Sequence, residues 1–83
     1  MHYVYIFKSL KNGKLYKGYT SDLRKQINEH NRGYEKFTKT GIPWKLVYYE
    51  AFSDKTDARR EELFLKSGKG KERIKFLLEN TLI

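Results

Sequence analysis

Cysteine is absent from this sequence of 83 residues, which excludes disulfide bonds and zinc sites built on thiolates. Long apolar runs are missing too, since no segment approaches the roughly 20 residues that a membrane-spanning helix requires. The first residues lack a charged segment followed by an apolar one, which is the pattern of a secretion signal. We therefore expect a soluble cytoplasmic protein that does not enter a membrane.

Acidic residues are few compared with basic ones. Eighteen Lys and Arg residues against ten Asp and Glu residues give a formal net charge of +8, which suits a polyanionic partner such as nucleic acid. Alternatively, the charge keeps a small domain soluble, or it meets an anionic membrane surface or an acidic protein. Hydrophobic residues form 39% of the chain, enough for a thin core, and the length predicts a single domain over residues 1–83.

Two β-strands joined by a tight turn are predicted near the start of the chain. Residues 3–7 and 15–19 are rich in β-branched and aromatic side chains. Between them, Asn12 and Gly13 favour the positive φ angles of a two-residue turn. The segment therefore predicts a β-hairpin.

The rest of the chain predicts one more strand and three helices, which gives the element order ββαβαα. Residues 44–52 have few polar interruptions, so we expect this strand to be central and covered on both faces. N-cap oxygens and apolar periodicity place the helices. They are expected over residues 23–30, from Ser53 or Asp54 to about 66, and over about 71–79, with residues 67–70 ending the second one.

Several side chains that can move protons lie on the hairpin and the helix after it. Tyr5 and Tyr16 fall on the paired strands, and Tyr19 and His30 lie on the adjoining strand end and helix. A phenol can give or take a proton, and a neighbouring histidine makes this useful at neutral pH. These four residues could converge on one site. The alternative is that they are half-buried strand residues with solvated hydroxyls.

Two carboxyl groups on the second helix are candidate ligands for a hard cation. Mg²⁺ takes oxygen ligands and often only one of them comes from the protein. Glu61 and Glu62 both qualify, and helical phase does not choose between them. The alternative is that both form ordinary ion pairs on a solvated helix, for example with Lys66.

A glycine-rich basic segment follows that helix. Ser67-Gly68-Lys69-Gly70-Lys71 exposes backbone N–H groups where the next helix begins, which favours a contact to phosphate. The spacing of a nucleotide-hydrolysing P-loop is missing. A plain turn between two helices explains the segment equally well.

In their order and spacing, five segments resemble the GIY-YIG nuclease family, in particular its small stand-alone bacterial members. The likeness covers almost the whole chain. It implies an α/β (α+β) fold with a three-stranded antiparallel sheet flanked by helices, in agreement with the order ββαβαα. The segments are Tyr3-Val4-Tyr5, Tyr16-Lys17-Gly18, Asp22-Leu23 through His30-Asn31, Pro43-Trp44-Lys45-Leu46-Val47-Tyr48-Tyr49-Glu50 and Leu65-Lys66-Ser67-Gly68-Lys69-Gly70.

The resemblance implies a DNA endonuclease that hydrolyses phosphodiesters with one divalent metal ion, Mg²⁺ or Mn²⁺. It implies that Tyr5 and Tyr16 face the scissile phosphate, where one of them helps to activate water, and that Glu62 binds the metal. His30 takes the active-site position of the first helix, and Gly18 matches the motif glycine that lets the backbone approach the substrate. Further expected contacts to duplex or branched DNA are Tyr19, Lys66, Lys69 and Lys71. Asn80 is a loose match to an asparagine near the end of the family's domain.

The sequence departs from the family pattern most seriously at Gln26, where the family has an arginine that stabilises charge on the phosphate. Losing one preorganised donor to a transition-state oxyanion costs about 10²–10³ in rate. Arg24 and Lys25 are poor substitutes, because they are displaced by roughly 200° and 100° around the helix. Smaller departures are Tyr3, Lys17 and Glu61.

Three functions remain open at this point. The first is a metal-dependent DNA endonuclease. The second is a nucleic-acid-binding module that has lost catalysis, which Gln26 motivates. The third is a protein-interaction unit whose charge is incidental. The first two both predict steep salt dependence of binding, because neutralised phosphates release counterions.

Overall fold

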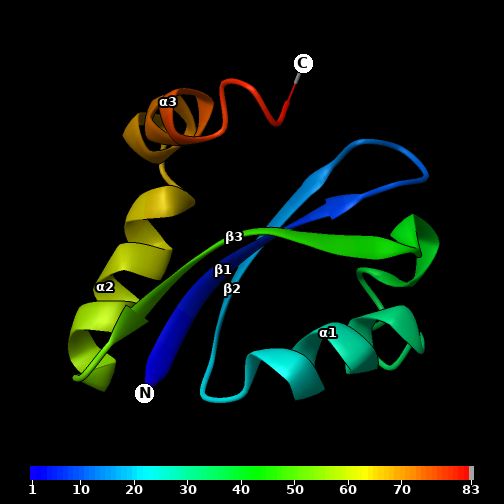
Figure 1. The fold of residues 1–83 in the computed structure, drawn as a ribbon, viewed down its shortest axis with the longest axis horizontal. Coiled ribbons are helices and arrows are strands. Elements are labelled where there is room, and N and C mark those ends of the chain that lie inside the picture. The colour runs from blue at the N-terminus through cyan, green and yellow to red at the C-terminus, as the bar shows by residue number, and fades with distance from the viewer. Residues whose placement is uncertain (83) are drawn as a thin grey trace.

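The computed structural model describes residues 1–82 and contains a three-stranded antiparallel sheet flanked by helices (Figure 1). This α+β architecture and the order ββαβαα confirm the predicted fold. One short 3-10 helix, η1, precedes the last strand. The elements are β1 (His2–Ser9), β2 (Leu15–Thr20), α1 (Leu23–Asn31), η1 (Lys39–Gly41), β3 (Trp44–Phe52), α2 (Lys55–Leu65) and α3 (Gly68–Leu77).

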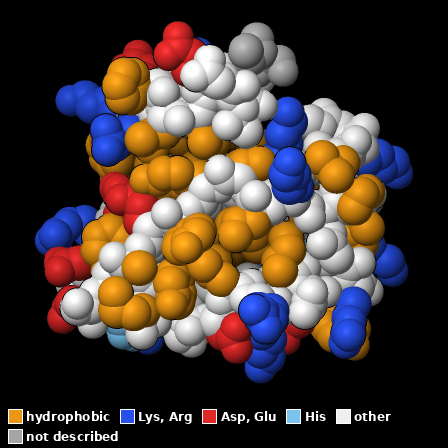
Figure 2. Space-filling view, in the orientation of Figure 1, with side chains coloured by type: hydrophobic (Ala, Val, Ile, Leu, Met, Phe, Trp, Pro, Cys, Tyr) orange, Lys and Arg blue, Asp and Glu red, His pale blue; other side chains and the backbone are white. Residues whose placement is uncertain are grey.

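β1 is the middle strand of the sheet, whose order is β2-β1-β3. Its residues 4–7 are at most 1% exposed. The prediction that residues 44–52 form the central strand is wrong: β3 has the predicted bounds but lies at the edge, where Lys45 and Tyr49 are exposed. Both strands are rich in aromatic side chains, but a tyrosine on an edge strand keeps part of its surface in water. Figure 2 shows apolar side chains gathered over β3, with Lys and Arg side chains around the rim.

Two apolar clusters cover opposite faces of the sheet. Alternation along β1 places Val4 and Ile6 in the cluster with α2 and α3, and Tyr5 and Phe7 in the cluster with α1. Figure 1 shows α1 on one side of the sheet and the other two helices on the opposite side. The helices contribute Ala58, Leu65, Ile74 and Leu78 to the first cluster, and Leu23 and Ile27 to the second.

The β-hairpin is confirmed, but its connection is not the predicted two-residue turn. The Ser9 N–H donates to the Lys14 carbonyl at 2.9 Å, so residues 10–13 form the loop. Gly13 has φ +75°, whereas Asn12 does not have a positive φ, and the predicted turn needs both. The Ser9 hydroxyl explains the difference, because it accepts hydrogen bonds from the N–H groups of Lys11 and Asn12 and thereby holds a wider loop.

Aspartate side chains cap the first two helices at the predicted positions. The Asp22 carboxylate accepts a hydrogen bond from the Lys25 N–H at 3.1 Å, and Asp54, rather than Ser53, accepts one from the Thr56 N–H at 2.8 Å. These bonds satisfy N–H groups that have no partner within the helix. The helix bounds of α1 and α2 differ from the predicted ones by one residue.

The prediction for the third helix is wrong at its start. α3 begins at Gly68, so the glycine-rich segment is the first turn of this helix and not a loop before it. The Ser67 hydroxyl caps the helix by accepting from the Gly70 N–H at 3.2 Å. A Cβ atom at position 70 would overlap the Phe64 carbonyl oxygen. Gly70 therefore allows the close approach of α3 to α2. The sequence pattern did not distinguish this packing role from a role in binding phosphate.

The chain between α1 and β3 is tied to the start of β3. The Asn31 side chain accepts from the Trp44 N–H at 2.6 Å and donates to the Trp44 carbonyl at 3.0 Å. The Trp44 indole N–H donates to the Thr38 carbonyl at 2.7 Å. These bonds fix Thr38 under α1. Among the described residues, no helix is long and apolar enough to cross a membrane.

Candidate active site

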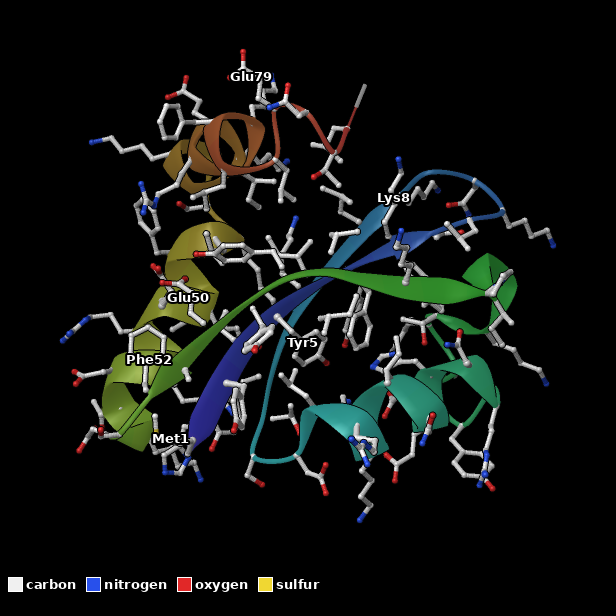
Figure 3. The ribbon with its side chains drawn as sticks, in the orientation of Figure 1. Met1, Tyr5, Lys8, Glu50, Phe52 and Glu79 are labelled. Atoms are coloured by element: carbon white, nitrogen blue, oxygen red, sulfur yellow. The ribbon has the colours of Figure 1, made fainter. Side chains whose placement is uncertain are left out.

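Tyr5 lies at the centre of the sheet with its phenol on the α1 side (Figure 3). Its cross-strand partner on β2 is Gly18, and a Cβ atom there would overlap the Tyr5 hydroxyl. The missing side chain therefore makes room for the phenol. Burial is the main cause that raises the pKa of the Tyr5 hydroxyl, and neighbouring Tyr16 raises it further. Tyr5 is thus a neutral hydrogen-bonding group at physiological pH.

Tyr16, on β2, lies beside Tyr5 of β1 and is less deeply buried than Tyr5. The centroid of its ring is 6.3 Å from that of Tyr5 and 4.9 Å from that of His30. Burial raises the pKa of the Tyr16 hydroxyl, and the carboxylate of Glu35 adds to this effect. The two tyrosines and the histidine form one aromatic cluster under α1.

His30 is completely buried and both of its ring nitrogens have partners. Nδ1 lies 2.7 Å from the Thr38 hydroxyl, which itself donates to the Glu35 carbonyl at 3.3 Å. We therefore assign the ring proton to Nδ1, so that Nε2 is an acceptor. Burial lowers the pKa of His30. The structure thus holds a neutral imidazole with its lone pair toward the tyrosines.

Gln26 completes this network one helical turn before His30. Its side-chain amide donates to His30 Nε2 at 3.1 Å, and the Tyr5 hydroxyl reaches the same nitrogen at 3.4 Å. Tyr5 of β1, Tyr16 of β2 and Gln26 of α1 thus converge on one imidazole. An amide supplies a hydrogen bond at this position but no positive charge.

Glu62 lies on α2 and is 8% exposed. Lys66 Nζ donates to its Oε2 at 3.0 Å, and Arg59 Nε lies 3.3 Å from Oε1. Oε1 is buried and accepts no hydrogen bond. The carboxylate also raises the pKa of Tyr5 and Tyr16, so it acts on the same cluster from the other helix. A buried carboxylate oxygen without a hydrogen bond is unusual in a folded protein.

The residues present fit a hard divalent cation held by one protein ligand. No group of three or more His, Asp or Glu residues that could hold a metal occurs within residues 1–82. Mg²⁺ and Mn²⁺ accept a single carboxylate when water and phosphate oxygens complete the shell. Glu62 Oε1, which accepts no hydrogen bond, suits this role. Glu61 lies apart from it and lines a cavity with Glu50 on the side of β3.

Tyr19 does not converge with the other aromatic residues. By strand alternation it lies on the opposite face of β2, where its hydroxyl is 2.7 Å from His2 Nδ1. The Arg59 guanidinium lies 5.3 Å from the centroid of its ring. The prediction that Tyr19 meets Tyr5, Tyr16 and His30 is therefore wrong.

The remaining candidates lie at the end of α2, on α3 and after α3. Lys66 pairs with Glu62. Lys69 and Lys71 are exposed in the first turns of α3, and Asn80 is exposed after that helix.

Three residues of the site were not found from the sequence. Thr38 and Glu35 lie in the loop after α1, where no periodic pattern indicates which side chain turns inward. Arg59 precedes Glu62 by three residues, and the i, i+3 spacing of opposite charges could have indicated this pair. Only tertiary contacts identify Thr38 and Glu35 as part of the site, whereas the sequence spacing alone could have indicated Arg59.

Comparison with known proteins gives the same assignment. The family model of the GIY-YIG catalytic domain matches residues 1–75. The chain belongs to the GIY-YIG family. Its place in this family implies a nuclease-type domain and a nucleic-acid substrate.

The relatives of this GIY-YIG chain include small bacterial proteins named UPF0213. One from Staphylococcus saprophyticus is 40% identical over 79 residues, covering 94% of this chain and 95% of that protein. Another from Staphylococcus haemolyticus is 43% identical over the same shares. The solution NMR structure of a UPF0213 protein from Bacillus halodurans has a TM-score of 0.55 at 39% identity, covering 92% of this chain and 83% of that one.

Proposed function

We propose that this protein is a metal-dependent DNA endonuclease that hydrolyses phosphodiester bonds in duplex or branched DNA. The observation that carries the proposal is the buried Oε1 of Glu62, which accepts no hydrogen bond and belongs to a carboxylate that acts electrostatically on the buried phenol of Tyr5 and the half-buried phenol of Tyr16. A basic chain with a net charge of +8 supplies the attraction to DNA. The absence of cysteine suits the cytoplasm.

The phenols would act as neutral hydrogen-bonding groups. Their pKa values are raised by burial, so deprotonation of either one at neutral pH is unfavourable. Tyr16, the more accessible of the two, would orient the attacking water. Tyr5 would accept the water proton at its oxygen while passing its own proton to Nε2 of neutral His30, which lies 3.4 Å away, and this proton would replace the hydrogen bond that Nε2 accepts from the Gln26 amide. The proton would end on the imidazole.

Glu62 would hold Mg²⁺ or Mn²⁺, which supplies Lewis-acid stabilisation of the charge on the phosphate when bound. Lys66 already neutralises one oxygen of this carboxylate, so it would also lie next to the substrate phosphate. Gly18, Lys69 and Lys71 belong to the proposed substrate contacts, whereas Tyr19 would reach DNA only on the other face of β2.

The second candidate is a nucleic-acid-binding module without cleavage. Gln26 favours it, because the amide N–H is already used by His30 Nε2 and brings no charge to the phosphate. Such a module would bind DNA with the same steep salt dependence and show no metal-dependent product.

Cleavage of supercoiled plasmid and branched DNA in Mg²⁺, Mn²⁺ or EDTA tests the proposal. We expect metal-dependent nicking that falls by at least about 10²-fold in Glu62→Gln, which removes the metal ligand without changing the size of the side chain. Glu61→Gln is the matched control on the same helix and should retain the rate. Tight, salt-dependent binding without any nicking in either metal would establish the binding module instead.

A further inference from the structure

A cavity of about 400 Å³ lies on the face of β2 opposite Tyr16, between this strand and α3. Its walls are largely apolar and come from Leu15, Ile74 and Leu82. Its rim is basic and consists of Lys14, Lys17, Lys71 and Lys75. Within the described part of the chain, no acidic residue lines it.

The four lysines gather charge that the protein does not neutralise. The salt bridges among the described residues involve none of them. Lys17 is half-buried, and its burial lowers the pKa of its ammonium group, with Lys71 and Lys66 adding to this effect. Like charges that meet around an apolar wall destabilise a fold unless an anion joins them. The cavity is therefore suited to a ligand with both an anionic and an apolar part.

Lys66 connects this cavity to the candidate active site. Its ammonium group bonds Glu62 at 3.0 Å and lowers the pKa of Tyr16 on one face of β2 and of Lys17 on the other. Positive charge therefore continues around the edge of the sheet from Glu62 to the cavity. A polyanionic strand lying across Glu62 would meet the rim lysines next.

We propose that this cavity binds one nucleotide unit, with the flat base on the apolar wall and the phosphate on the rim lysines. The proposal rests on the proposed function insofar as that unit belongs to the substrate strand. Lysine is a good partner for phosphate. Sequence-independent binding of single strands combines a charged groove with aromatic side chains under the bases, and in this cavity the aliphatic wall of Leu15, Ile74 and Leu82 takes their place. A free nucleotide has the same chemistry, so the experiment must distinguish the two sources.

Methyl NMR spectra report on the cavity without any need for cleavage. We would titrate Glu62→Gln protein with deoxyadenosine monophosphate and, separately, with a short single-stranded oligonucleotide, and follow the methyl groups of Leu15, Ile74 and Leu82. Shifts with both ligands, or with the oligonucleotide alone, support a site for the substrate strand. Shifts with the mononucleotide alone support a free nucleotide as the ligand.

A charge-matched pair of variants tests the role of the rim. Lys71→Gln/Lys75→Gln and the control Lys25→Gln/Lys45→Gln, whose lysines do not line the cavity, each reduce the net charge by two. We expect the first pair to weaken oligonucleotide binding about tenfold and to lower the slope of log affinity against log salt by about 1.4, and the control to change both much less.

Two results would overturn the proposal. One is the absence of methyl shifts with either nucleotide ligand. The other is methyl shifts that occur only with vesicles of anionic lipid, which would indicate a membrane contact. If either result occurs and the unmodified protein still nicks DNA, the nucleotide site is excluded and the nuclease proposal stands. If the methyl groups shift with a nucleotide ligand but the unmodified protein does not nick DNA, the nuclease proposal is excluded and the nucleotide site stands.

Discussion

Glu50 and Glu62 each have a buried carboxyl oxygen that accepts no hydrogen bond, but the two side chains lie in opposite electrostatic surroundings. Glu62 is flanked by Arg59 and Lys66. Glu50, on β3, faces α2 (Figure 3) and shares a cavity of about 440 Å³ with Glu61. Burial and the carboxyl group of Glu61 raise the pKa of Glu50 to about 7. Two similar geometries therefore differ in chemistry: the free oxygen of Glu62 lies beside cations, whereas the carboxyl group of Glu50 lies beside a second acid, which favours its protonated form.

The largest expected effect concerns a positive charge that is missing from the candidate active site, at Gln26 of α1. Gln26→Arg would place a cation in the network of His30 and the tyrosines. We expect the rate of plasmid nicking to rise by about 10²-fold, because a charged donor stabilises the phosphate in the transition state. The measurement is the single-turnover nicking rate at saturating protein.

Asn28→Arg is the matched control for this substitution. It adds the same charge to α1 at an exposed position two residues away, which is about 200° around the helix. Equal rate increases in both variants would show that general attraction of DNA, and not the placement of the charge, causes the gain.

A smaller effect is expected at His30, whose ring nitrogens both have partners, in contrast to the two glutamates. Thr38→Val removes the acceptor of the Nδ1 proton and leaves a buried N–H group without a partner. We expect the free energy of unfolding to fall by about 1–3 kcal/mol, measured by urea denaturation. Thr40→Val, at an exposed position of the same loop, should change it little. An equal loss in both variants would contradict the proposed tautomer.

The sequence was sufficient for the element types and their order along the chain, but not for the order of the strands in the sheet and only for part of the site. Hydrophobic alternation and N-cap residues placed the elements, because these signals are local: Asp22 and Asp54 cap the helices as their positions predict. Strand order was not predicted correctly, since β1 and β3 are similar in composition and only tertiary packing decides which is central. The convergence of Tyr5 and His30, 25 residues apart, was indicated by their places on the hairpin and the adjoining helix, and the family pattern assigned both to the active site.

Other features required the three-dimensional structure. Helical phase left Glu61 and Glu62 equivalent, and it is the approach of α2 to the sheet that gives them different neighbours. The lysines around the cavity are contributed by β2 and α3, which pattern analysis treated as separate segments. Gly70 looked suitable for phosphate because its role in helix packing depends on a neighbour that only the fold supplies.

The smallest effect tests the Glu50 side of the comparison. The folded-state pKa of about 7 lies above the ordinary value of 4.5 for this carboxyl group, so the folded protein binds the proton more tightly than the unfolded chain. The stabilisation is present below pH 4.5 and is lost as the pH rises through 7. Glu50→Gln removes this dependence. Tyr48, Glu61 and Arg73 are the other titratable groups that act on Glu50.

Between pH 5 and pH 8 the unmodified protein should lose stability that Glu50→Gln keeps. We expect the free energy of unfolding of the variant, relative to that of the unmodified protein, to rise by about 1–2 kcal/mol over this range, after allowance for partial exposure to solvent. Urea denaturation at both pH values measures this difference, and Glu79→Gln, an exposed carboxyl group on the far end of the chain, is the control. The nicking rate should not change in either variant. If Glu50→Gln abolished nicking while the stability difference between the variant and the unmodified protein were the same at both pH values, Glu50 would be the metal ligand, because a carboxyl group that binds a cation must be ionised.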